Sequence, residues 1–177
     1  MKPATFEKIT QVQGILLKRY PNYFDLEPGI RVLLAMSVLA NDIKVRETSN
    51  NHGEWVRAIL DTTDLTEGNP WCAAAIVFCS FVAKLDRPQR FARVYDWIRW
   101  ATIRGRLKTQ PKRGYLCAYL NPDNTGHVGI VAGSALGFVR SYEGNTSPGN
   151  EGSQRDGGGL YPRNRRSKVW KFYIDLS

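Results

Sequence analysis

We predict an α+β fold from two features of the sequence and their order. Apolar residues recur at helical spacing through the first hundred residues. After Pro111, short segments rich in β-branched and aromatic residues alternate with turn-forming residues, as strands do. We find no internal repeat and no linker. Helices first and strands second favour N-terminal helices packed against an antiparallel sheet.

Five helices are expected in the first part of the chain. Pro28 suits the first turn of the second helix, because proline is well tolerated there. The third covers Glu54 to Leu60, and the fourth is a run of small and apolar residues that begins at Cys72. The fifth extends from Arg87 to about Arg104. The apolar positions that define the first, second and fifth helices are Phe6, Ile9, Val12 and Leu16; Ile30, Leu33, Leu34 and Val38; and Phe91, Val94, Tyr95, Ile98 and Ala101.

Four strands are expected after the helices. They cover Gly114 to Leu120, His127 to Ala132, Phe138 to Glu143 and Val169 to Ile174. Residues 144–159 contain six glycines and are expected to form a mobile surface loop.

Composition and length bound the class of protein. A chain of 177 residues suits one domain, and its 42% hydrophobic and 23% charged content is ordinary for a soluble globular protein. The longest apolar run is too short to span a bilayer, and the first residues do not read as a secretory signal. The three cysteines include no close metal-ligand pair, so we expect free thiols, synthesis in the cytoplasm, and neither metal nor cofactor.

The formal charge of +9 is unevenly distributed. From Arg87 to Arg113 there are nine Lys or Arg and one acid, Asp96. A second basic cluster consists of Arg155, Arg163, Arg165, Arg166, Lys168 and Lys171. Such fields concentrate anionic partners near a surface. Nucleic acid, anionic cell-envelope polymer and a merely solubilising face remain open on this observation.

Cys72 is the strongest candidate for a nucleophile. The thiolate is the reactive form of cysteine, and a helix N-terminus stabilises negative charge. Cys79 lies two turns inside the same predicted helix and Cys117 in the middle of a predicted strand, so both suit burial as small apolar residues. From position alone, Cys72 is equally open to a packing role and to a chemical one.

A thiol nucleophile needs a base, and the chain has two histidines, His52 and His127. His52 lies in a polar loop and suits a solvated or capping role. If Ser134 to Leu136 form a three-residue loop, His127 lies directly opposite Glu143, where a carboxylate can orient the imidazole. Asn145 would share a face with Glu143 if the strand continues. This register is an inference, because a slip of one residue would reverse the faces.

The blocks "PWCAAAIVFCSF", "GHVGIVAG" and "SYEGN", in this order and spacing, resemble the CHAP domain, a group of cysteine- and histidine-dependent amidohydrolases and peptidases within the papain-like, NlpC-related superfamily. The likeness begins at "VRETSNNHGEWV" and covers roughly residues 40 to 175. It implies a papain-like fold with Cys72 as nucleophile at a helix N-terminus, His127 as general base, Glu143 as orienter and Asn145 as supporting polar residue.

The resemblance also implies a substrate. CHAP domains mostly cut amide bonds of bacterial peptidoglycan, and many are phage endolysins. We therefore expect a bacteriolytic amidase or endopeptidase that acts at the cell wall after release, virion carriage or injection. Its basic face would meet anionic wall polymer or lipid head groups. Residues 1–39 would form a helical extension or cap, and residues 40–177 the catalytic domain, packed as one unit.

The chain departs from the family pattern at two points. Where relatives often have Gly-Asp before the histidine strand, it has Gly114-Tyr115, and it lacks an acidic loop of the calcium-binding kind. Two other functions stay open: a non-catalytic basic module that binds nucleic acid or anionic polymer, and a cysteine protease that acts on a protein. Loss of Cys72 would leave the first unaffected, whereas the second differs from a wall hydrolase only in substrate.

Overall fold

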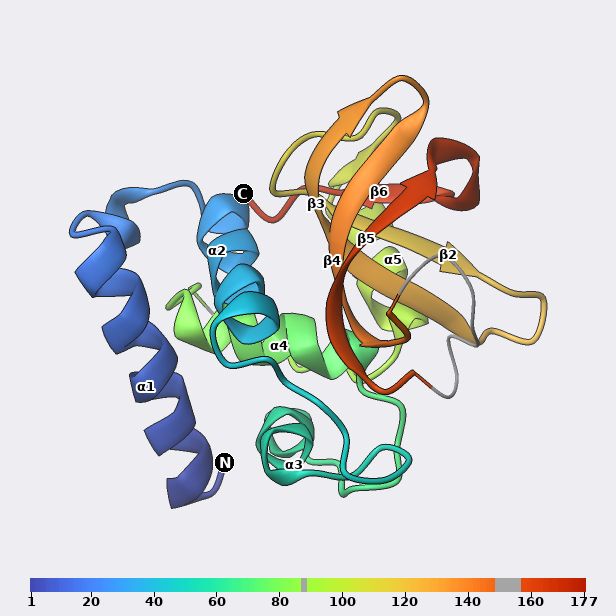
Figure 1. Ribbon diagram of the computed structural model, residues 1–177. Coiled ribbons are helices and arrows are strands. Elements are labelled where there is room, and N and C mark those ends of the chain that lie inside the picture. Colours follow the sequence, from blue (N-terminus) through green and yellow to red (C-terminus); the bar gives the residue numbers. More distant parts are fainter. Residues whose placement is uncertain (87–88, 149–156) are drawn as a thin grey trace.

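Five helices precede a six-stranded antiparallel sheet in the computed structural model, which describes residues 1–86, 89–148 and 157–177 (Figure 1). The helices are α1 (Pro3–Arg19), α2 (Pro28–Asn41), α3 (Glu54–Asp61), α4 (Cys72–Val82) and α5 (Val94–Ile103). The strands are β1 (Leu107–Lys108), β2 (Leu116–Leu120), β3 (Gly126–Ala135), β4 (Phe138–Thr146), β5 (Gly159–Arg166) and β6 (Phe172–Ile174), in the spatial order β1-β6-β2-β3-β4-β5. The α+β prediction is confirmed.

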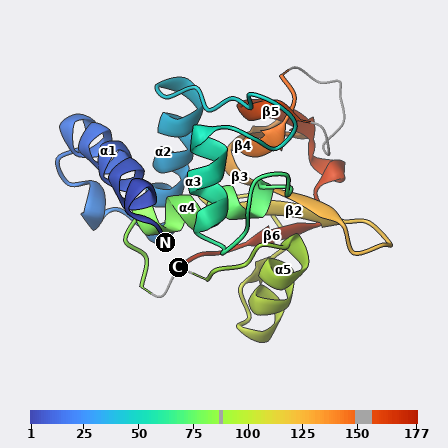
Figure 2. The same ribbon diagram turned by 90° about the horizontal axis from the view of Figure 1, so that it is seen from below.

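The central element is α4, which lies between the other N-terminal helices and the sheet. It contacts α1, α2 and α3 on one side and β3 and β4 on the other. All of its residues except Phe81 are buried, because a helix that is apolar all round finds no solvent-facing side. Figure 2 shows α1 to α4 gathered together and α5 set apart beside β6.

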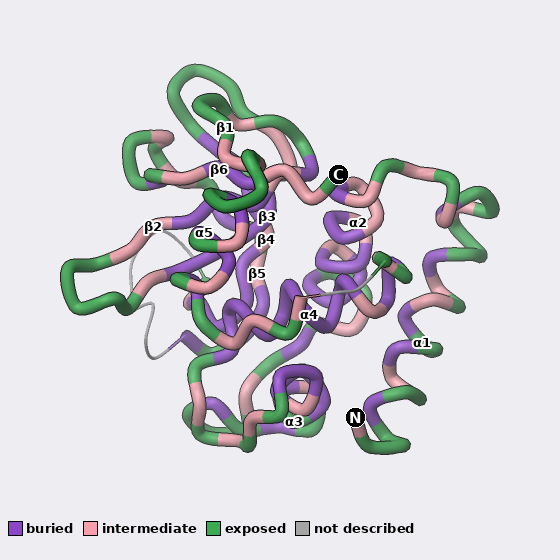
Figure 3. Tube along the Cα trace, turned by 180° about the vertical axis from the view of Figure 1, so that it is seen from behind, coloured by how far each residue is buried: buried purple, intermediate pink, exposed green. Residues whose placement is uncertain are grey.

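The sheet is covered on both faces, as the burial in Figure 3 indicates. On β3, Val128 and Ile130 belong to the large core shared with the helices, and Val131 belongs to a second cluster. Successive side chains of a strand alternate between faces, so His127 shares the face of Val131. The second cluster consists of Cys117, Val131, Val139, Trp170 and Tyr173.

Several predicted boundaries were wrong. Residues 89–93 are not helical, and α5 begins only at Val94, after an extended Arg93. Residues 87–88 lie outside the described part. The segment 144–159 is not one loop, because β4 continues to Thr146 and β5 begins at Gly159; residues 149–156 lie outside the described part. Ser167–Val169 form a turn of 3-10 helix ahead of β6.

No helix in the described part of the chain is long and apolar enough to cross a membrane.

Candidate active site

Cys72 is the first residue of α4, directly after Trp71. Trp71 is fully buried, and its indole N–H donates to Glu47 Oε1 at 2.8 Å, which fixes the start of the helix. The backbone N–H groups of Ala73 and Val128 lie beside the Cys72 thiol and lower its pKa. Donors aimed at a sulfur favour its thiolate form. Cys72 retains 8% exposure, so the sulfur lies at the edge of the core.

His127 is buried at the start of β3, with its side chain beside the Cys72 thiol, which raises the pKa of the imidazole. Its Nε2 lies 2.9 Å from Glu143 Oε2, which leaves Nδ1 for the sulfur. The imidazole stacks on Trp170, with ring centroids 6.4 Å apart and planes at 24°, and lies tilted beside Tyr119 at 6.1 Å. These rings restrict the imidazole to an orientation that serves both partners.

Glu143 reaches His127 from a register that differs from the predicted one. The connection between β3 and β4 is a two-residue turn, Leu136-Gly137, and the pairing shifts between Val131 and Gly133. Glu143 therefore lies opposite Gly129 rather than His127. The difference is two residues, an even number, so both side chains stay on one face. The Glu143 side chain passes over Gly129 to reach His127. A Cβ at residue 129 would lie only 2.7 Å from Glu143 Cγ.

Arg165 and Ser141 hold the Glu143 carboxylate, and sequence reasoning missed both. Arg165 Nε and Nη2 donate to Glu143 oxygens at 2.8 to 3.1 Å, and Ser141 Oγ donates at 2.7 Å. Arg165 also lies over Trp170, with its guanidinium carbon 5.8 Å from the ring centroid. The available signal was the alternation of Arg163 and Arg165 at strand spacing within the basic cluster.

The network separates charge between Cys72 and His127. Burial alone would lower the pKa of His127, but its hydrogen bonds with Cys72 and Glu143 raise that pKa to about 9. Burial alone would raise the pKa of Glu143, but His127 and Arg165 lower it to about 2. Burial likewise opposes the thiolate of Cys72, yet hydrogen bonding to His127 leaves its pKa below the ordinary value. A thiolate beside an imidazolium, held by an ionised Glu143, follows from these directions.

Asn145 lies in an adjacent polar cluster rather than in the chain of hydrogen bonds from Cys72 to Arg165. Its φ of 53° is left-handed, and the pairing of β4 with β5 is irregular between Glu143 and Thr146. Its amide nitrogen can donate to Asn51 Oδ1 at 3.1 Å and to Glu47 Oε1 at 3.3 Å. β4 continues through Asn145 to Thr146, but the contacts open to the Asn145 side chain are with Asn51 and Glu47 and not with His127. Asn145 is linked to the start of α4 through Glu47, which also accepts the hydrogen bond from Trp71.

His52 takes no part in this network. Its Nδ1 lies 2.6 Å from the backbone oxygen of Asn50, within its own turn. Cys79 and Cys117 are fully buried, and burial raises the pKa of both thiols well above the ordinary value. Within residues 1–86, 89–148 and 157–177, no group of three His, Cys, Asp or Glu side chains is placed to hold a metal ion.

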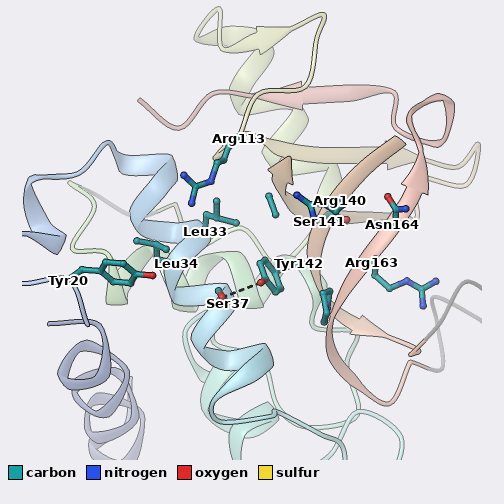
Figure 4. Close-up of a pocket in the computed structure, with 12 residues that line it drawn as sticks. Tyr20, Leu33, Leu34, Ser37, Arg113, Arg140, Ser141, Tyr142, Arg163 and Asn164 are labelled. Carbon is teal, nitrogen blue, oxygen red and sulfur yellow. Dashed lines mark hydrogen bonds between the residues drawn. The ribbon is translucent and has the colours of Figure 1, made fainter. Parts of the chain in front are cut away.

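A cavity of about 620 Å³ lies between α2 and strands β3 to β5, and none of Cys72, His127 and Glu143 lines it (Figure 4). Tyr142 lines it and accepts a hydrogen bond from Ser37 at 3.2 Å. Because Tyr142 and Glu143 are consecutive on β4, this cavity lies on the other face of the strand from the carboxylate.

Comparison of the chain with models of known families, with curated proteins and with solved structures finds no match. The function is therefore argued from the site and from the resemblance of the sequence blocks.

Proposed function

We propose that the chain is a papain-like cysteine hydrolase that cleaves amide bonds of bacterial peptidoglycan. The observation that carries the chemistry is the placement of His127 between Cys72, whose pKa it lowers, and Glu143, to which it is hydrogen-bonded and which Arg165 holds in turn. This arrangement supports the roles of nucleophile, base and orienter that acyl-transfer chemistry requires. The substrate class rests on the resemblance of the three sequence blocks to CHAP domains.

The reaction runs in two halves. The Cys72 thiolate attacks the amide carbonyl, and the oxyanion that forms accepts hydrogen bonds from backbone N–H groups at the start of α4. The His127 imidazolium gives its proton to the leaving amine as the C–N bond breaks, which leaves a thioester on Cys72. Neutral His127 then removes a proton from water, and the resulting hydroxide releases the acid and restores the thiolate.

Glu143 supports both halves by favouring the imidazolium whenever it forms. Arg165 and Ser141 hold the carboxylate in place, so Glu143 accepts a hydrogen bond from His127 without taking its proton. Cys72 keeps 8% exposure, against 1% for His127 and 0% for Glu143, which fits a sulfur that meets substrate while its partners are shielded from water.

Digestion of purified peptidoglycan, followed by mass analysis of the released fragments, tests the proposal and identifies the bond. We expect fragments with one new amine and one new carboxyl group per cut. Cys72→Ser and His127→Ala should release none, and His52→Ala should match the wild type. Walls of several chemistries that all stay intact would overturn the assignment. Cleavage of an unfolded protein with intact walls would favour the protease alternative.

A further inference from the structure

The turn that joins β3 to β4 carries an apolar residue where both geometry and solvent disfavour it. Leu136 is 98% exposed and has a φ of 50°, and Gly137 follows with a φ of 76°. Two-residue turns with positive φ at both positions normally take Asn-Gly or Asp-Gly, because these residues tolerate the left-handed region. A leucine at this position is stabilised neither by the turn geometry nor by burial away from water.

A second segment places more apolar surface and positive charge beside this turn. The Ser167 N–H donates to Gly137 O at 2.8 Å, so the turn Ser167–Val169 adjoins the hairpin. Phe138 is 40% exposed and pairs with Arg166 on β5. We define the hairpin tip as Leu136, Phe138, Arg166, Lys168 and Val169, all of them exposed (Figures 1 and 3).

The charge at the hairpin tip has one sign. The Arg166 and Lys168 side chains make no hydrogen bond or ion pair with any described residue, and the sequence contains no Asp or Glu in 130–142 or in 157–174. The turn projects from the end of the sheet (Figure 1), and Leu136 in it is almost fully exposed, so it offers a projecting apolar point rather than a groove.

We propose that the hairpin tip docks this protein on an anionic lipid surface. Leu136 and Phe138 would enter the boundary between head groups and acyl chains, and Arg166 and Lys168 would meet lipid phosphates. A convex apolar point needs a partner that deforms around it, which lipid does. The proposal does not require that the chain be a hydrolase, since it uses no residue of the Cys72 network.

Co-sedimentation with vesicles tests this surface. We expect the wild type to bind vesicles of phosphatidylcholine mixed with phosphatidylglycerol, and to bind pure phosphatidylcholine much less. Leu136→Asn should weaken binding about tenfold or more, because it removes a whole apolar side chain from the lipid. The same change should leave the melting temperature unchanged or raised, because asparagine accepts the left-handed turn position. Lys168→Gln should weaken binding about fivefold, on the anionic vesicles only.

Ile103→Asn is the matched control, since Ile103 is also apolar, 71% exposed and near arginines, but ends α5. It should bind as the wild type does. Equal losses in both variants, or no loss in Leu136→Asn, would overturn the hairpin tip as the docking surface, as would a wild type that ignores anionic vesicles. Failure of the wall digestion with intact vesicle binding would count against the hydrolase alone, and Cys72→Ser should bind vesicles normally.

Discussion

At the scale of single residues, the site separates three thiols by their surroundings. Cys72 has an imidazole beside its thiol and a lowered pKa, whereas Cys79 and Cys117 are at 0% exposure and burial raises the pKa of both. Of the three thiols, only Cys72 therefore has surroundings that suit a nucleophile, and the other two suit a packing role. Reactivity measures this difference directly, because alkylation needs the thiolate.

We expect iodoacetamide to label Cys72 alone in the folded protein. An ordinary thiol loses about tenfold in rate for each pH unit below its pKa. The lowered pKa of Cys72 keeps more of its thiolate present as the pH falls, so labelling of Cys72 should decline less than labelling of an ordinary thiol. Peptide mass analysis identifies the labelled site. His127→Ala should slow the labelling of Cys72 under these conditions, and faster labelling of Cys79 would contradict the assignment.

Glu143 couples the site to stability through its lowered pKa. Its folded pKa is about 2, against an ordinary value of 4.5. This carboxylate therefore contributes stability fully above about pH 4.5 and loses the contribution as pH falls through about 2. The free energy of unfolding lost in Glu143→Gln should be on the order of 3 kcal/mol at neutral pH and should shrink toward pH 2.

Urea denaturation at a series of pH values measures this difference. Glu7→Gln, which changes an exposed glutamate of α1, is the control and should differ little from the wild type throughout. Glu143→Gln should also lose most turnover, because the imidazolium loses its ionised partner. A stability difference for Glu143→Gln that stays constant from pH 7 to pH 2 would contradict a shifted carboxylate.

At the scale of elements, the pairing of β3 with β4 directs the Glu143 carboxylate toward His127. Gly129 provides the space that Glu143 crosses to reach His127, because a Cβ there would also lie 2.9 Å from Tyr142 O. The bulge between Val131 and Gly133 sets the register that puts Gly129 at this point. Geometry between strands, rather than any one side chain, thus orients the base.

Gly129→Ala should displace Glu143 and cut turnover by at least about tenfold, as loss of an orienter does. It should also slow alkylation of Cys72, since the imidazolium loses support. Gly133→Ala on the same strand is the control, because the nearest atom to its added Cβ would be Arg140 Nη2 at 3.6 Å. Wild-type turnover in Gly129→Ala would mean that Glu143 reaches His127 by another path.

The sequence pattern predicted correctly the elements whose buried face is marked by a regular spacing of their own apolar residues. The starts of α2 and α4 were predicted at the residues where the structure has them. The strand β5 was missed, because it is charged and begins among glycines; Leu160 is its one apolar side chain in the large core, and it forms by pairing with β4. Arg165, which that strand carries to Glu143, was missed for the same reason. The register of β3 with β4 could not be predicted from the sequence either, since a bulge adds a residue to one strand without a local sequence signal.

At the scale of the whole molecule, the N-terminal helices belong to the same core as the site. α1 buries Ile9, Val12 and Leu16 and contacts α2, α3 and α4. Gln13 of α1 also donates to Val82 O at 2.9 Å, at the end of the helix that Cys72 begins. If residues 1–39 were a detachable cap, they could unfold alone; this shared core indicates that they cannot.

A substitution in α1 should therefore destabilise the entire chain. Leu16→Ala removes a fully buried side chain and should cost about 3 kcal/mol, whereas Leu17→Ala, at a neighbour with 39% exposure, should cost far less. All five tryptophans lie beyond residue 39, and among the described residues only Trp55 has a cation–π contact with α1, through Lys8 at 4.2 Å, so their fluorescence reports mainly on the rest of the chain, while far-UV circular dichroism reports on every helix. We expect both signals to follow one transition and Leu16→Ala to lower its midpoint in both. If the fluorescence transition stayed at the wild-type midpoint while the dichroism split in two, residues 1–39 would be a separate folding unit.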